Sequence, residues 1–214
     1  MTYDWSAAMA RRSNRQTAMR ARLAAAAARI MAEDGIDDFA LAKRKAAKRL
    51  GVLDTQALPA NEEIEAELRA YRALYQSDHG ELIDDLRRIA LDAMRTLEGF
   101  SPYLTGPVLK GTAGPYAEIE LQLFPDSAKD VEMFLLDRGI NFTTQEARRY
   151  AGDRAHAVGL ISLTWHGQPL KLAVFDARDE RLALKTSVAG KVAERANVAE
   201  VSALLSTNNA GKMP

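Results

Sequence analysis

The sequence contains no cysteine among its 214 residues, so neither disulfides nor cysteine-based metal sites can form. It also lacks any run of about 20 apolar residues, which a membrane-crossing helix requires. The N-terminal segment has no apolar core of signal-peptide length, because six arginines interrupt it: Arg11, Arg12, Arg15, Arg20, Arg22 and Arg29. We therefore expect a cytoplasmic protein without membrane partners.

The sequence also lacks a net charge, because its 29 Lys and Arg residues balance its 29 Asp and Glu residues. The charges are unevenly spread: residues 1–60 are rich in Lys and Arg, and residues 61–100 are rich in Asp and Glu. Such a distribution is more typical of solvated helix faces than of a nucleic-acid footprint.

Several motifs of common enzymes are absent from the sequence. It holds no phosphate-binding loop of the G-x-x-x-x-G-K-[ST] type, no dinucleotide-binding glycine pattern after a strand, and no G-x-S-x-G nucleophile turn. The three histidines, His79, His156 and His166, are not spaced as metal ligands. None of these motifs therefore indicates an active site or a metal site in this chain.

The first half of the chain reads as helical. Apolar residues at helical spacing and helix-ending glycines predict four helices, over residues 17–34, 39–50, 61–75 and 81–97. Asn61 is the expected N-cap of the third. We expect a helical domain over residues 1–99.

The second half mixes strands and helices. Residues 117–124 alternate polar and apolar side chains, residues 128–137 read as a helix, and residues 155–176 read as two strands joined by a turn at His166 and Gly167. A last helix is predicted over residues 198–205. The expected fold class is α+β, with a helical N-terminal half and a small mixed sheet with flanking helices over residues 100–214.

The most informative segment is GPVLKGTAGPYAEIEL, residues 106–121, which joins a glycine-bounded turn to the first strand. Its two carboxylates, Glu118 and Glu120, are two residues apart, so a strand places both on the same face. Two carboxylates beside a glycine turn can hold one divalent cation next to a bound phosphate.

This segment resembles the minimal nucleotidyltransferases of the DNA polymerase beta superfamily, whose signature reads G-S-x-A-R-G-x-A-x-x-x-S-D-I-D-L. The matching positions, in register and without a gap, are Gly106, Lys110, Gly111, Ala113, Glu118, Ile119, Glu120 and Leu121. The resemblance covers about sixteen residues closely and about seventy loosely. It implies Mg²⁺-dependent transfer of a nucleoside monophosphate from a nucleoside triphosphate to an acceptor that is a protein, RNA or small molecule.

The resemblance also implies the roles of individual residues. Glu118 and Glu120 are the expected catalytic carboxylates and Mg²⁺ ligands, and Asp176 is the candidate for a third catalytic carboxylate. The triphosphate would lie on the turn, with contacts from Gly106, Pro107, Lys110, Gly111 and Thr112.

The sequence departs from the family pattern in three ways. Pro107 replaces the serine that follows the first glycine, glutamates replace both aspartates, and Lys171 stands at the position of the third carboxylate. Asp176 ends the same predicted strand but faces the opposite way by alternation. An active nucleotidyltransferase and a catalytically degenerate nucleotide- or partner-binding module therefore both remain open. So does a third interpretation, in which Glu118 and Glu120 are ordinary solvent-facing strand residues.

A DNA-binding regulator is a further alternative. Residues 24–52 resemble the DNA-binding helices of TetR-type repressors, and five basic residues of this unit would contact phosphates: Lys43, Arg44, Lys45, Lys48 and Arg49. The similarity ends at Val52, where a recognition helix should follow and a proline-containing loop stands instead.

Overall fold

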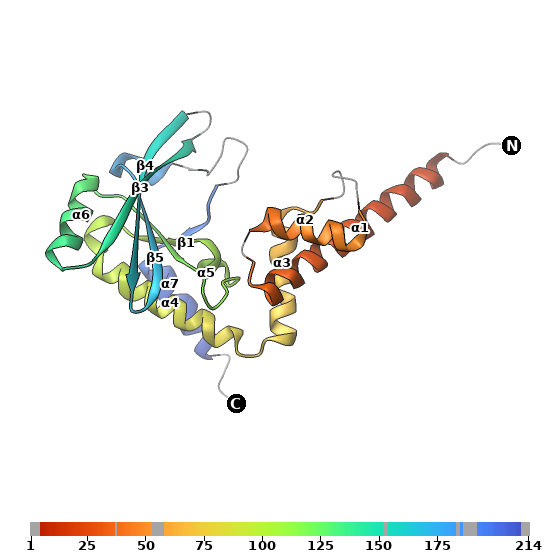
Figure 1. Cartoon of the computed structure of the whole chain (residues 1–214), viewed down its shortest axis with the longest axis horizontal. Helices are drawn as coiled ribbons and strands as arrows, with labels where there is room; N and C mark the ends of the chain where they lie inside the picture. The colour runs from red at the N-terminus through yellow and green to blue at the C-terminus, as the bar shows by residue number, and fades with distance from the viewer. Residues whose placement is uncertain are drawn as a thin grey trace. The chain divides into compact units, whose positions relative to one another are not determined.

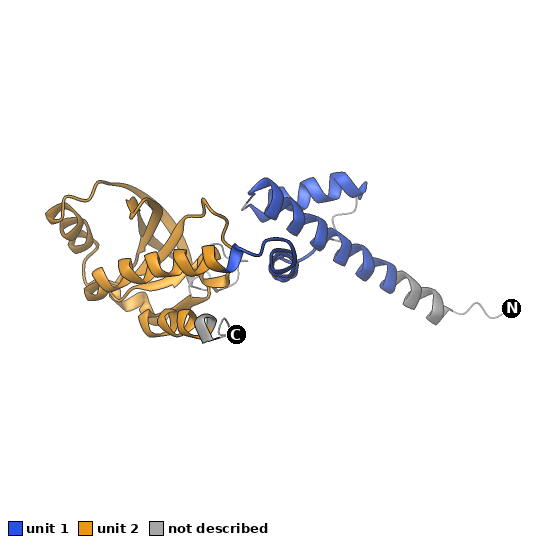
Figure 2. Ribbon diagram, turned by 90° about the horizontal axis from the view of Figure 1, so that it is seen from below, with its two compact units in different colours: residues 1–80 blue, residues 81–214 orange. Residues whose placement is uncertain are grey.

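The computed structural model describes residues 5–36, 38–52, 58–151, 154–182, 185 and 192–210. The chain forms two compact units, residues 1–80 and 81–214 (Figure 2). The sequence predicts the boundary near residue 99 instead. The difference is one helix, α4 (His79–Thr96), whose buried residues Ile83, Leu86 and Met94 belong to the core of the second unit.

Within its described residues, the first unit contains three complete helices: α1 (Trp5–Asp34), α2 (Phe39–Leu50) and α3 (Asn61–Tyr75). They share one apolar core with buried residues from all three, among them Leu23, Ala46 and Leu68. The start of α2 is fixed by Asp38, whose side chain accepts hydrogen bonds from the first amides of the helix. The predicted bounds of α2 are confirmed.

Two expectations about this unit need correction. The first helix begins at Trp5, twelve residues before the predicted start at Thr17. Asn61 is not the N-cap of α3, because Ala60 holds that position and its amide is bound by the Glu63 side chain at 2.6 Å. The side chain of Asn61 instead accepts a hydrogen bond from Lys43 at 2.8 Å.

The second unit is built on a sheet with the strand order β3-β4-β5-β2-β1-β6 (Figure 1). Its strands are β1 (Tyr103–Thr105), β2 (Ile119–Leu123), β3 (Phe142–Ala151), β4 (Arg154–Trp165), β5 (Gln168–Val174) and β6 (Arg195–Ala196). Among the strands that the structure describes, β2 and β5 are parallel neighbours and the other neighbouring pairs are antiparallel. The predicted α+β class is confirmed.

Helices cover one face of this sheet, which carries the apolar residues of the central strands, such as Leu121 and Leu172. The helices are α4, α6 (Ala128–Asp137) and α7 (Val198–Ala210), with a five-residue helix α5 (Gly106–Lys110) between β1 and β2. Buried Val131 of α6 and Val201 of α7 join the same core. Alternation along the strands turns Glu120 and Lys171 to the opposite face.

The hairpin between β4 and β5 forms as predicted. His166 and Gly167 both have positive φ angles, 47° and 83°, which suits the tight twist of a two-residue turn. Strand β3 was not expected from the sequence. In the described part of the chain, no helix has the length and apolar character needed to cross a membrane.

Candidate functional site

The first part of the site is the connection from β1 through α5 to β2. The two strands are antiparallel neighbours, and Thr105 at the end of β1 pairs with Glu120 in β2. Gly106 follows Thr105 with a φ of +71° and begins α5. The glycine turn and the two glutamates therefore lie next to each other, as the sequence pattern requires.

Strand β5 brings Lys171 to the glutamates. In the parallel pairing of β2 with β5, Lys171 is the partner of Glu120. Its Nζ atom lies 2.7 Å from Oε2 of Glu118, and the two side chains are 35% and 34% exposed. Glu118 is thus engaged in a partly shielded ion pair with the residue that the family pattern aligns with a third carboxylate.

The environment of Glu120 disfavours the charged form of its carboxyl group. Burial raises the pKa of the Glu120 carboxyl above its ordinary value, and the charge of Lys171 only partly opposes this effect. The neighbouring negative charge of Glu118 raises the pKa of Glu120 further. Two more cations, Arg149 and Lys110, act on the same carboxylate with smaller effects.

The donor set does not fit Mg²⁺ as it stands. Glu118 is bound to Lys171, burial favours the neutral form of Glu120, and an ammonium holds the place of a third oxygen ligand. Mg²⁺ prefers an octahedral set of oxygen ligands. Among the residues that the structure describes, no three acidic or histidine side chains gather in a way that could hold a metal ion.

Asp176 lies away from the two glutamates. It follows the carboxyl end of β5, whereas Glu118 and Glu120 lie at the amino end of the parallel strand β2. There Asp176 begins the short helix η3 (Ala177–Arg181), and its carboxylate accepts hydrogen bonds from the amide and the guanidinium of Arg178. The structure does not bring this predicted catalytic residue to the site.

The expected phosphate contacts on the turn are partly used within the fold. The Gly111 amide donates to the Val108 carbonyl at 3.3 Å, and the Thr112 amide donates to the Pro107 carbonyl at 2.9 Å. These two bonds close the C-terminal end of α5. Thr112 is also buried, and only 6% of it is exposed. The amides of Gly111 and Thr112 therefore stabilise the turn.

Sequence reasoning missed Arg87, which holds this turn in place. Arg87 of α4 donates to the carbonyl oxygens of Val108 at 3.3 Å and Leu109 at 2.8 Å. The residue is only 8% exposed, and burial lowers the pKa of its guanidinium. The sequence feature that could have identified Arg87 is its position four residues after Ile83, which places it on the apolar side of a helix.

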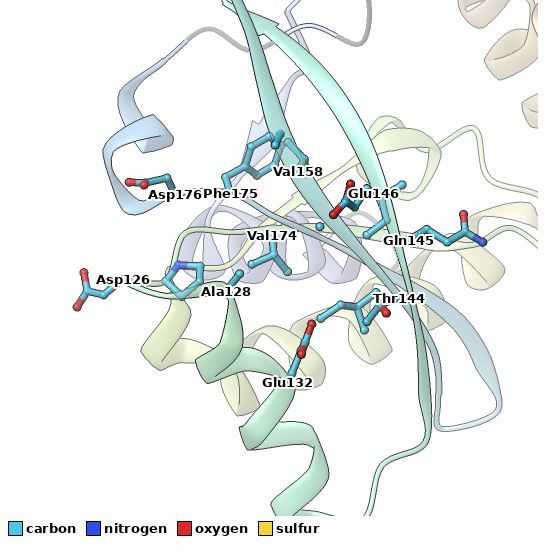
Figure 3. Close-up of a pocket in the computed structure, with 15 residues that line it drawn as sticks. Asp126, Ala128, Glu132, Thr144, Gln145, Glu146, Val158, Val174, Phe175 and Asp176 are labelled. Atoms are coloured by element: carbon cyan, nitrogen blue, oxygen red, sulfur yellow. The ribbon is translucent and has the colours of Figure 1, made fainter.

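A pocket of about 500 Å³ lies elsewhere in the second unit (Figure 3). It is lined by the start of α6, by β3 and β4, and by the residues that end β5. Asp176 lines this pocket, whereas Glu118 and Glu120 do not. The sequence patterns gave no indication of it.

The basic residues of the first unit are partly engaged within that unit. Lys43 donates to Asn61, and Lys45 lies 3.3 Å from a carboxylate oxygen of Asp34. The described chain after α2 continues only to Val52 and resumes at residue 58, so most of the predicted loop lies outside the described residues. The next helix, α3, starts at Asn61. DNA binding by this unit stays a prediction.

In comparisons with known proteins, no family model matches the chain, and it matches neither a curated protein nor a solved structure.

Proposed function

We propose that the second unit is a nucleotidyltransferase-like domain that binds a nucleoside triphosphate without transferring it. The observation that carries the proposal is the Lys171–Glu118 ion pair of 2.7 Å, at the point where the family pattern has a third carboxylate. A fixed ammonium there neutralises a glutamate that a catalytic site would use for metal. The same ammonium is a ready partner for a phosphate oxygen.

The connection of the elements supports the nucleotidyltransferase-like character. A strand ending at a glycine, a short helix and an antiparallel strand with two glutamates follow each other in the order that the resemblance requires. The strand that carries Lys171 is the direct parallel neighbour of β2. The aligned positions of the family pattern therefore meet in space.

The charges around Glu120 support binding of an anion. Lys171, Arg149 and Lys110 all act on the carboxylate of Glu120, and they outnumber Glu118 and Glu120. Because burial disfavours the ionised form of Glu120, the local balance is more positive than a count of residues suggests. A bound triphosphate is stabilised by this positive charge if it replaces Glu118 as the partner of Lys171.

The proposal is tested by calorimetric titration of the full chain with ribonucleoside triphosphates in the presence of a metal chelator. We expect saturable binding. A double variant, Lys171→Met with Glu118→Gln, removes the ion pair without changing the net charge, and we expect about tenfold weaker binding. Lys129→Met, which removes an exposed lysine of α6, is the matched control and should bind normally. Absence of binding to the unaltered chain would refute the proposal.

Nucleotidyl transfer itself is the second candidate. It is favoured by the position of Glu118 and Glu120, which project from one face of the sheet beside Gly106. The test is incubation with Mg²⁺, labelled nucleoside triphosphates and candidate acceptors of protein, RNA and small-molecule type. Label transfer by the unaltered chain that is lost in the Glu118→Gln, Glu120→Gln double variant would establish catalysis and overturn the non-catalytic proposal.

A further inference from the structure

The pocket between α6 and the β3–β4 hairpin combines an apolar floor with an acidic rim. Its floor includes Ile161 and Val174, which are almost completely buried. An open pocket of about 500 Å³ with such a floor is of the size and character that small organic ligands occupy.

Two carboxylates extend toward this floor, and they come from two different elements of the unit. Glu132 of α6 and Glu146 of β3 extend toward the space between these two elements (Figure 3). Asp126 and Asp176 also line the pocket, but their carboxylates point away from its floor (Figure 3). Among the described residues that line the pocket, none carries a positive charge.

Asp176 is the N-cap of η3 and pairs with Arg178 at 3.1 Å, so its carboxylate is already engaged. Glu132 and Glu146 extend toward one shared space from two different elements. Like charges that face a shared space repel each other, and a cation placed between them relieves that repulsion. The pocket is therefore complementary to a positively charged ligand.

The pocket is separate from the site of Glu120 and Lys171. Val174 is three residues after Lys171 in β5, and alternation turns the two side chains to opposite faces of the sheet. Val174 belongs to the core that the helices cover, as does Ile161. A ligand in the pocket therefore contacts neither Glu118 nor Glu120.

We propose that this pocket binds an organic cation with an aliphatic body, such as a polyamine. One ammonium group lies between Glu132 and Glu146, and the methylene chain attached to it covers the apolar floor. The apolar floor beside the two carboxylates favours a cation with an aliphatic body over a compact metal ion. This inference does not depend on the proposed binding of nucleotide.

The test is calorimetric titration of the full chain with spermidine, together with two reference ligands. Octanediol offers a similar methylene chain without charge, and Mg²⁺ offers charge without an apolar body. We expect saturable binding of spermidine only. Equal or tighter binding of either reference ligand, or no saturable binding of spermidine, would overturn the proposal.

Three variants locate the binding. Glu132→Gln with Glu146→Gln should weaken spermidine binding about tenfold, because two partly exposed charge pairs are lost. Glu98→Gln with Asp137→Asn removes two exposed carboxylates outside the pocket and should leave binding unchanged.

Gly159→Leu provides the third test, because Gly159 lines the pocket and a Cβ at that position meets Val174 at an ordinary contact distance of 3.9 Å. The leucine side chain should fill the pocket and abolish spermidine binding. This variant tests the assignment independently of the charge variant, and so it remains informative if the charge variant folds poorly. Spermidine binding that survives both the Gly159→Leu and the charge variants would refute the assignment.

Discussion

The carboxyl carbon of Glu120 lies directly against Gly106: a Cβ added at position 106 would stand 2.9 Å from it. Real Cβ atoms essentially never approach another heavy atom so closely. Gly106 also has a φ of +71°, which residues with a Cβ adopt only at a cost. The positive φ therefore favours glycine at position 106, and an added Cβ would also force the end of the Glu120 side chain to move.

Substitution of Gly106 by alanine should destabilise the protein for these two reasons. The positive φ alone costs about 1 kcal/mol, and displacing the Glu120 carboxylate, which ends a flexible side chain, should add a smaller amount. Gly139→Ala is the matched control, since Gly139 has a φ of +66° and no atom lies within 4 Å of its added Cβ. Urea denaturation should show a larger loss for Gly106→Ala than for Gly139→Ala.

The additional loss at position 106 should disappear when Glu120 is shortened to alanine. In a double-mutant cycle, the coupling between positions 106 and 120 reports the contact alone, because the φ penalty is the same in both backgrounds. A coupling near zero would mean that Glu120 does not occupy the space above Gly106.

Glu120→Gln should stabilise the protein at neutral pH. The pKa of Glu120 is raised in the folded state, mainly by burial, so the folded protein binds this proton more tightly than the unfolded chain does. That contribution to stability is complete below the ordinary pKa of glutamate and is lost as the pH rises through the raised pKa. The variant does not titrate, so its advantage should grow from about pH 4 to about pH 7.

The measurement is the free energy of unfolding of both proteins at a series of pH values. Glu98→Gln, which removes an exposed carboxylate, should show no such trend. An advantage of Glu120→Gln that is constant or decreases toward neutral pH would contradict the raised pKa.

Lys171→Asp should create a site that responds to divalent metal. The change replaces the ammonium beside Glu118 with a carboxylate, so three carboxylates would converge on one face of the sheet. Their repulsion should lower the melting temperature, and Mg²⁺ should restore part of it by binding the folded state. The melting temperature of Lys171→Met, which adds no oxygen ligand, should not respond to Mg²⁺. A metal response in both variants would show that position 171 does not control metal binding.

The sequence predicts most accurately those elements whose ends are determined by residues close in the chain. Helix α2 lies between a capping Asp38 and the helix-ending Gly51, and helix α6 starts after Ser127, so local hydrogen bonds determine their ends. Strand β3 was missed because its sequence, FTTQEARRYA, has polar residues on both faces, as befits a strand at the edge of a sheet.

The site also combines local and long-range features. The position of Glu120 beside Gly106 depends on a short segment of the chain, and the two residues are neighbours in the structure. The ion pair of Glu118 with Lys171 joins residues 53 positions apart, and the pocket joins a helix to two later strands. Only the tertiary arrangement shows whether a carboxylate is available to a ligand or already bound to a lysine.

The last prediction concerns Arg87, which we regard as a positioning residue for the turn. Arg87 donates to the carbonyl oxygens of Val108 and Leu109 from two different guanidinium nitrogens, Nε and Nη2, and the single nitrogen of a lysine does not reproduce this spacing. We expect Arg87→Lys to lower the free energy of unfolding by about 1–2 kcal/mol. Amide hydrogen exchange should also accelerate at Gly111 and Thr112, whose amides close α5.

The matched control is Arg88→Lys, the exposed neighbour on the same helix, whose ion-pair partner is Asp85. Because that pair is solvent-exposed, its change should affect neither stability nor exchange at the turn. If Arg87→Lys lowers stability but exchange at Gly111 and Thr112 stays as slow as in the Arg88→Lys control, Arg87 contributes to packing without positioning the turn. Faster exchange confined to the turn would instead connect a buried arginine of α4 to the geometry of the glycine segment that carries the candidate site.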